Sequence, residues 1–160
     1  MSSDKTDELI EQVGFEFRRY QNVSDEFEDT VAEWLGTNRT DLRCTDIIDR
    51  HGRLTAGDLA RETGLTTGAV TSILDRLEGL GLVKRVRDTE DRRRVMVELT
   101  DKAIRNGKEI WGPLKSASRT SLSRYSDEQL IFVREFLASS QRFMAEQTAR
   151  VRGLRRRRPR

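Results

Sequence analysis

The chain has few of the side chains on which most catalytic and metal sites depend. It contains one cysteine, Cys44, and one histidine, His51, in 160 residues. A single cysteine cannot form an internal disulfide, and one histidine with no cluster of His, Cys and carboxylate residues at ligand spacing argues against zinc. A glycine-rich phosphate loop and a nucleophile–base pair are also missing. We therefore expect no enzyme, no cofactor and no metal site.

Long apolar runs are missing as well. No segment approaches the roughly 18 apolar residues that a membrane-spanning helix needs, and the opening residues MSSDKTDELI do not have the pattern of a signal peptide. Hydrophobic residues make up 35% of the chain and charged residues 36%. These features predict a cytoplasmic protein with no membrane partner.

Charge is abundant but unevenly distributed. The 30 Lys and Arg residues outnumber the 27 Asp and Glu residues by only three. Acidic residues dominate before Leu35, whereas residues 85–94 and 151–160 are rich in arginine. Such segregation is typical of a protein that meets a polyanion with one face only.

The segment 54–81 predicts two short helices joined by a tight turn. Thr55 can cap the first helix and Gly64 can end it. The second helix has apolar positions at helical spacing: Val70, Ile73, Leu74 and Leu77. Two helices that cross steeply need a small residue at the crossing, here Ala60, and a glycine in the corner. The spacing indicates a helix-turn-helix, and a helix pair from any small bundle is the alternative.

A predicted β-hairpin follows these helices. The segments 82–86 and 95–99 are β-prone, and between them lies the arginine-rich sequence RDTEDRRR. An arginine at a hairpin tip can enter a narrow minor groove or pair with phosphates. The helices and the hairpin together predict a winged helix-turn-helix that binds double-stranded DNA. A solvated turn with balanced charge is the alternative for the hairpin alone.

The chain resembles the MarR family of bacterial transcription regulators in this region. The resemblance is carried by LDRLEGLGLVKR at 74–85 and DTEDRRRVMVELT at 88–100. The family's wing runs Asp-Pro-x-Asp-Arg-Arg and then a strand ending in Leu-Thr. The chain departs at Thr89, where proline is common, and at Ala103, where glycine is common.

The resemblance implies a sequence-specific transcriptional regulator, more often a repressor than an activator. It also implies an obligate homodimer that binds a pseudo-palindromic operator, since a twofold dimer presents two recognition helices about 34 Å apart. Two other readings stay open. One is a non-specific nucleoid-type DNA binder, and the other is a redox-sensing regulator that acts through Cys44.

We expect a mainly α-helical fold with a small β-hairpin wing. Residues 1–36 and 101–150 are predicted to be dimerisation helices that flank a winged helix-turn-helix domain at 37–100. The flanking helices carry more apolar positions than a small core needs, although they could instead complete a monomer core. Residues 151–160 are expected to be a disordered basic tail that adds phosphate contacts, or a solvated tail of no consequence.

The polar face of the second helix of the motif is expected to read bases. Threonine hydroxyls can bond base edges, and their methyl groups can contact thymine. The candidate residues are Thr66, Thr67, Gly68, Thr71, Ser72, Asp75 and Arg76.

In the wing, Arg92, Arg93 and Arg94 are the candidates for contacts with DNA. Asp88 and Asp91 are unfavourable beside a polyanion unless they pair with cations. We therefore expect them to form ion pairs with Arg85, Arg87 or an arginine at the tip.

A small-molecule effector is implied by the resemblance, because family members often respond to aromatic or lipophilic anions bound between the helical arms and the DNA-binding lobe. Tyr20, Trp34 and Trp111 could line such a cleft, or they could belong to the core, as large aromatic residues at helical spacing usually do.

Cys44 has two possible roles. One branch of the family senses peroxides through a reactive cysteine near its N-terminus, but Cys44 lies in the second predicted helical segment. Arg43 would lower the pKa of its thiol, whereas Asp46 and Asp49 oppose this. A plain buried thiol is therefore the expectation.

Overall fold

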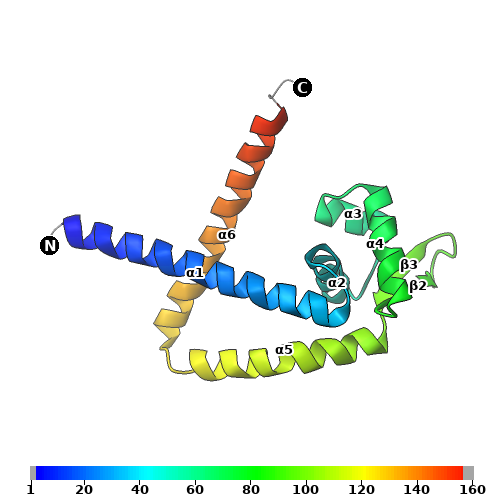
Figure 1. The fold of residues 1–160 in the computed structure, drawn as a ribbon, viewed down its shortest axis with the longest axis horizontal. Coiled ribbons are helices and arrows are strands. Elements are labelled where there is room, and N and C mark those ends of the chain that lie inside the picture. The colour runs from blue at the N-terminus through cyan, green and yellow to red at the C-terminus, as the bar shows by residue number, and fades with distance from the viewer. Residues whose placement is uncertain (1–2, 157–160) are drawn as a thin grey trace. The chain divides into compact units, whose positions relative to one another are not determined.

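The structure is a computed structural model, and it describes residues 3–156 of the chain (Figure 1). Its elements are the helix α1 (Ser3–Leu35), α2 (Arg39–His51), the strand β1 (Arg53–Thr55), α3 (Ala56–Thr63), α4 (Thr67–Gly79), β2 (Val83–Arg87), β3 (Val95–Leu99), α5 (Asp101–Leu122) and α6 (Asp127–Arg156). The chain divides into two compact units, and the boundary between them falls between Ile110 and Trp111 of α5. The mainly helical fold and the winged helix-turn-helix confirm the prediction.

The sheet has three antiparallel strands in the order β1-β3-β2. In the central strand, Val97 is paired with Leu54 of β1 and with Arg85 of β2. The sequence predicted the hairpin of β2 and β3 but missed β1. A strand of three residues is too short to show an alternating pattern, and its pairing depends on a partner more than 40 positions away in the sequence.

The core of the first unit lies where α2, α3 and α4 pack together and against the sheet. The largest fully buried apolar side chains come from each of these elements: Ile48 of α2, Leu59 of α3, Val70, Leu74 and Leu77 of α4, and Val83 and Val97 of the strands. The buried positions of α4 are those that its helical spacing predicted. This core leaves the opposite side of α4 exposed.

Local capping sets the starts and ends of the helices that make the motif. The Thr55 hydroxyl accepts the backbone N–H of Asp58, whose carboxylate in turn accepts the N–H of Thr55, so α3 begins with a capping box. Gly64 ends α3 in the left-handed conformation at φ 71°, which glycine adopts without strain. These two positions confirm the predicted cap and turn.

The long helices α1, α5 and α6 differ from the core helices in their exposed apolar side chains. Val23 of α1 is 65% exposed, and Phe132 and Phe143 of α6 are 69% and 58% exposed. Of the helices that the structure describes, none combines the length and the apolar character that crossing a membrane requires.

The C-terminal region departs from the expected disordered tail. Helix α6 continues to Arg156, because arginine and leucine both favour helical backbone. The expectation of disorder is therefore wrong for residues 151–156, and residues 157–160 lie outside the described part of the chain.

Candidate DNA-binding surface

Helix α4 has one buried face and one exposed face. Thr66 caps it, with its hydroxyl accepting the backbone N–H of Ala69 at 3.3 Å. The predicted base-reading residues are all exposed: Thr66, Thr67, Gly68, Thr71, Ser72, Asp75 and Arg76. Their placement on one side follows from the apolar spacing that buries the other side.

The first two turns of α4 present small polar groups. The hydroxyl of Thr71 donates to the carbonyl of Thr67 at 3.0 Å, and that of Ser72 donates to the carbonyl of Gly68 at 3.2 Å. A hydroxyl whose proton is used in this way keeps its lone pairs, so both oxygens can accept a hydrogen bond from outside. A side chain at Gly68 would meet no atom within 4 Å, so a ligand can approach the backbone there.

The C-terminal part of α4 is held by ion pairs instead. The Asp75 carboxylate accepts Nη2 of Arg85 at 2.6 Å, and Glu78 accepts both Nη1 and the backbone N–H of the same arginine. The bond to Asp75 is the main reason that the pKa of Arg85 is raised. Arg85 therefore joins β2 to α4. Asp75 uses its carboxylate in this ion pair rather than for a contact with a DNA base.

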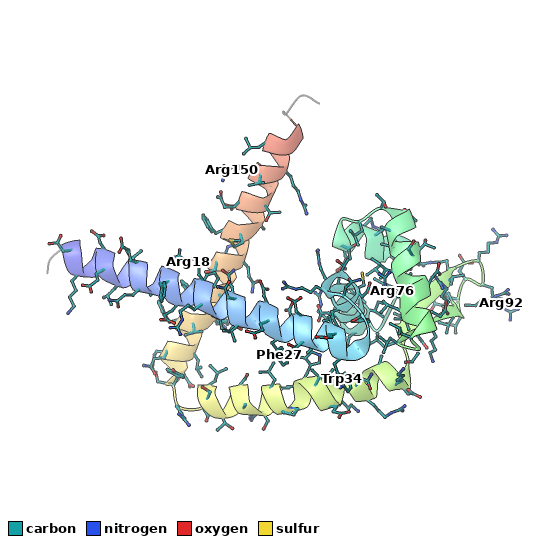
Figure 2. The ribbon with its side chains drawn as sticks, viewed as in Figure 1. Arg18, Phe27, Trp34, Arg76, Arg92 and Arg150 are labelled. Carbon is teal, nitrogen blue, oxygen red and sulfur yellow. The ribbon has the colours of Figure 1, made fainter. Side chains whose placement is uncertain are left out.

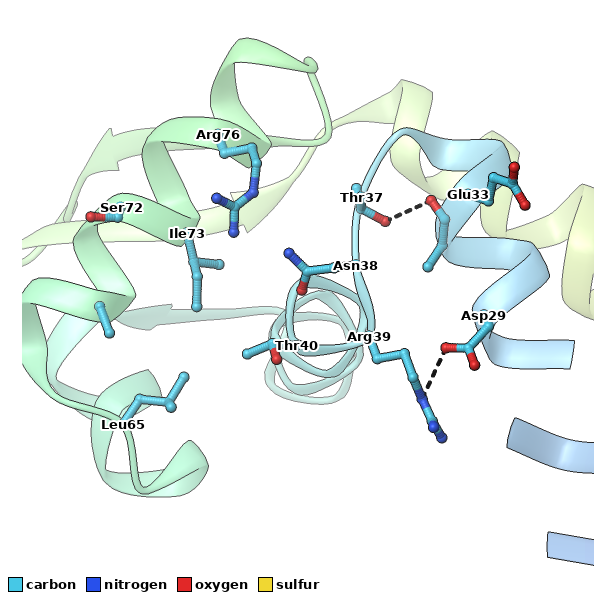
Figure 3. A pocket seen from close by; sticks show the side chains of 12 residues that line it. Asp29, Glu33, Thr37, Asn38, Arg39, Thr40, Leu65, Ser72, Ile73 and Arg76 are labelled. Atoms are coloured by element: carbon cyan, nitrogen blue, oxygen red, sulfur yellow. Dashed lines mark hydrogen bonds and ion pairs between the residues drawn. The ribbon is translucent and has the colours of Figure 1, made fainter. Parts of the chain in front are cut away.

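Arg76, which was predicted to face DNA, forms an ion pair within the protein. Its Nε and Nη2 donate to the two carboxylate oxygens of Asp41 at 2.8 Å and 2.6 Å. Figure 3 shows its guanidinium directed from α4 toward the start of α2. Asp41 is 0% exposed, and 35 residues separate it from Arg76, so the sequence contained no local signal for the pair.

The wing turn is built by carboxylates that bind backbone groups. Asp88 accepts the N–H groups of Glu90 and Asp91 at 2.8 Å and 3.1 Å, and Asp91 accepts that of Arg93 at 3.0 Å. The bond from Glu90 is the main cause of the lowered pKa of Asp88. Among the described residues neither aspartate lies within salt-bridge distance of an arginine, although the charges of Arg53 and Arg94 also lower the pKa of Asp88. Each aspartate instead closes the turn through its own neighbouring backbone.

The arginines of the wing tip remain available. Arg92, Arg93 and Arg94 are exposed, and Figure 2 shows Arg92 projecting from the end of the hairpin. Within the part of the chain that the structure describes, none of the three lies within 4 Å of a carboxylate oxygen. The Asp88 turn thus presents three exposed arginines at the wing tip.

The aromatic residues proposed for an effector cleft are on the surface. Tyr20 is 69% exposed, Trp34 58% and Trp111 42%, so the alternative that they fill a core is wrong. Tyr20 and Trp34 belong to the first unit and Trp111 to the second. Their spacing on helices was a correct sign of an apolar face, but not of its burial within one chain.

A pocket of about 830 Å³ lies in the first unit, between the end of α1, the start of α2 and the exposed side of α4. Figure 3 shows the residues that line it: Asp29, Ala32, Glu33, Thr37, Asn38, Arg39, Thr40, Leu65, Ala69, Ser72, Ile73 and Arg76. The predicted aromatic residues are not among them. Sequence reasoning missed this pocket because its lining comes from segments that are distant in the chain.

Cys44 is a buried thiol, as expected. It is 0% exposed, and burial together with the charge of Asp41 raises its pKa to about 11. At neutral pH the thiol is therefore protonated, whereas the thiolate is the form that reacts with peroxides. The structure disfavours the redox-sensor alternative.

Comparison with known proteins agrees with this geometry. The model of the MarR family matches residues 37–95, from the turn after α1 to the first residue of β3. The protein YcgE of Bacillus subtilis (strain 168), an uncharacterized HTH-type transcriptional regulator, is 34% identical over 135 residues, which cover 84% of this chain and 88% of YcgE. The HTH-type transcriptional repressor MdtR of the same organism is 27% identical over 112 residues, which cover 70% of this chain and 72% of MdtR.

A solved structure extends the likeness to the fold. Streptococcus pneumoniae FabT in complex with DNA superposes with a TM-score of 0.67 at 21% identity, over 86% of this chain and 99% of FabT. The order of helices and strands, the wing sequence and the identity to YcgE lead to the same conclusion: the chain belongs to the MarR family.

Proposed function

We propose that the chain is a sequence-specific transcriptional regulator that binds pseudo-palindromic operator DNA as a homodimer and represses transcription. The observation that carries this proposal is the exposed polar side of α4 together with the exposed arginines of the wing tip. One relative supports repression rather than activation, since MdtR is a transcriptional repressor.

The first two turns of α4 are the base-reading segment in this proposal. The hydroxyl groups of Thr71 and Ser72 donate their protons to backbone carbonyls, so their oxygens can accept, and Thr67 is exposed in the same segment. Such oxygens suit the amino groups of adenine and cytosine, and threonine methyl groups suit the methyl group of thymine. Asp75 and Arg76 are excluded from this segment because their charges are paired within the protein.

The wing supplies contacts that carry less sequence information. Arg92, Arg93 and Arg94 would bind phosphates or enter the minor groove, where a narrow groove concentrates negative potential. They would fix the position of the protein on the duplex while α4 reads the bases.

The dimer is proposed from the apolar side chains of the long helices. Several are at least 40% exposed: Leu9, Ile10, Val13, Val23, Ile131, Phe132, Val133, Leu137 and Phe143. Apolar surface on this scale is rare on a monomer and marks an interface. Residues 1–36 and 101–150 are therefore the proposed dimerisation regions, and twofold symmetry would place the two α4 helices about 34 Å apart.

Control by a small molecule is a second proposal, carried by the pocket beside α4. Its volume of about 830 Å³ is in the range of small-molecule sites, and Ser72, Ile73 and Arg76 of α4 line it directly. A bound aromatic or lipophilic effector would therefore contact the recognition helix itself. Titration of candidate effectors into the protein–operator complex would test this, with release of DNA as the expected result.

Selection of bound sequences from a random duplex pool tests the main proposal. It should be done near physiological salt, because phosphate contacts are strongly salt-dependent. A twofold-symmetric motif with half-sites about one helical turn apart is the expected result. Enrichment of base composition alone would instead indicate a non-specific nucleoid-type binder.

A further inference from the structure

Asp41 is an unusual residue in the winged domain, because a carboxylate is fully buried at 0% exposure. A buried charge is tolerated only when it is paired and hydrogen-bonded. Arg76 provides this through two parallel hydrogen bonds, 2.8 Å from Nε to Oδ2 and 2.6 Å from Nη2 to Oδ1. The pair joins α2 to the recognition helix α4.

The same carboxylate is part of the start of α2. Its Oδ2 accepts the backbone N–H of Asn38, and the side chain of Asn38 accepts the N–H of Asp41 at 3.0 Å. Next to this capping box, Arg39 contacts three carboxylates of α1, those of Asp25, Glu28 and Asp29. Figure 3 shows Arg39 reaching Asp29 on one side of this corner and Arg76 approaching it from the other.

The two kinds of contact that hold α4 constrain it differently. The buried face of α4 packs through aliphatic side chains, and apolar packing has little directional preference. A guanidinium bound through two nitrogens to one carboxylate defines both a distance and a plane. Ser72 lies one helical turn before Arg76, so a rotation of α4 that breaks the pair also moves the base-reading segment.

We infer that Asp41 is a positioning residue for DNA recognition, which sets the orientation of α4 through Arg76 without touching DNA. The inference rests on the proposed reading of bases by α4. Hydrogen bonds to base edges form within a few tenths of an ångström of their ideal length. An α4 released from Asp41 keeps its phosphate contacts but loses its alignment with the bases.

A direct role of Arg76 is the competing explanation, and it makes the opposite prediction for Asp41. The side chain of Arg76 is 44% exposed, so a guanidinium released from Asp41 could swing to a phosphate. In that case Asp41→Asn would leave DNA affinity unchanged or raise it. In the positioning role, Asp41→Asn and Arg76→Gln weaken operator binding alike.

The experiment measures Kd by fluorescence anisotropy for the selected operator and for a scrambled duplex. The variants are Asp41→Asn, Arg76→Gln, the double variant and Arg76→Lys, which keeps the charge but cannot form the two parallel bonds. Asp46→Asn is the matched control, because it makes the same substitution in α2 at an exposed residue that pairs with Arg50 at 3.2 Å. Thermal melting of each variant sets a temperature at which all of them are folded.

We expect Asp41→Asn and Arg76→Gln each to weaken operator binding by about 10- to 100-fold, the effect of losing one base readout. The double variant should bind the operator no more weakly than the weaker-binding single variant, since both substitutions remove the same ion pair. Binding to the scrambled duplex and the behaviour of Asp46→Asn should stay close to wild type. Arg76→Lys should lose preference for the operator while it keeps affinity for the scrambled duplex.

Two results would overturn the inference. One is operator binding by Asp41→Asn equal to wild type while Arg76→Gln is weak, which would assign Arg76 a direct contact. The other is full operator preference in Arg76→Lys, a variant that does not depend on the folding of Asp41→Asn. A wild-type protein that selects no sequence would instead refute the proposed function itself, so the two failures are distinguishable.

Discussion

The winged domain and the long helices cover their apolar side chains differently. In α4, Val70 and Leu77 are 0% exposed, whereas Phe132 and Phe143 of α6 are 69% and 58% exposed. Both helices have an amphipathic pattern, but only α4 meets a complementary surface in its own unit. The comparison teaches that residues 37–100 bury their apolar side chains within one chain. The apolar faces of the long helices are not buried in this chain and need a partner surface to cover them.

Removal of a core side chain from α4 should have the largest effect. Leu77→Ala leaves a cavity at a fully buried position, and we expect it to lower the free energy of unfolding by about 2–5 kcal/mol. Urea unfolding followed by circular dichroism measures this. Leu154→Ala in α6, where the leucine is 52% exposed, is the control and should change little. Equal losses of unfolding free energy at both positions would contradict the difference in burial between the winged domain and α6.

A charge placed on the apolar face of α6 should separate the dimer. Phe132→Asp would bury an unpaired carboxylate in the proposed interface, and we expect the dimer Kd to rise by about 100-fold or more. Sedimentation velocity over a concentration series measures it. Gln141→Asp adds the same charge half a turn away around the helix and should remain dimeric. A wild-type protein that sediments as a monomer at micromolar concentration would contradict the proposed interface.

The wing should contribute affinity rather than specificity. Arg92→Ala removes an exposed guanidinium at the tip, and we expect binding to weaken by about 1–3 kcal/mol on operator and scrambled DNA alike. The dependence of log Kd on log salt should become shallower by about one unit. Arg43→Ala, an exposed arginine of α2 outside the proposed surface, is the control. Unchanged binding in a band-shift assay would count against the wing.

The first turns of α4 should contribute specificity rather than affinity. Thr71→Ala removes one exposed hydroxyl and one methyl contact, and we expect a loss of about 1 kcal/mol confined to one base pair of each half-site. Sequence selection repeated with the variant should show that position relaxed and the others intact. A uniform weakening across all positions would mean that Thr71 acts through the helix and not on a base.

The capping box of α3 should add a small, pH-dependent term to stability. The hydrogen bonds of Thr55 lower the pKa of Asp58 in the folded protein. A lowered pKa stabilises the fold fully above the unfolded value of about 3.9 and less as pH falls through the folded pKa. The difference in Tm between wild type and Asp58→Asn should therefore narrow below about pH 4. A difference that is constant from pH 7 to pH 3 would contradict this.

The parts of the site that could be predicted are those set by neighbours in the sequence. Thr55 and Asp58, three residues apart, cap α3, and Gly64 ends it at φ 71°. The apolar residues of α4 recur with the period of a helix, so the exposed positions of Thr67, Thr71 and Ser72 followed directly.

Three sets of contacts could not be predicted, because they depend on partners that local patterns do not specify. Arg76 binds Asp41 across 35 residues, and Arg85 binds Asp75 instead of the wing carboxylates. The alternative that Tyr20 and Trp34 fill a core failed as well, because both are exposed in the chain. In each case the residue type indicated the kind of interaction but not the partner.

The sequence by itself determined the family, the winged helix-turn-helix and the side of α4 that faces outward. These properties depend on helical period, capping and turn residues, which act over a few positions. Only the tertiary structure decided that Asp41 holds Arg76, that Asp75 and Glu78 hold Arg85, and that a pocket lies beside α4. A charge can pair with any opposite charge that folding brings near it, so its partner is chosen by the packing of α2, α4 and the sheet.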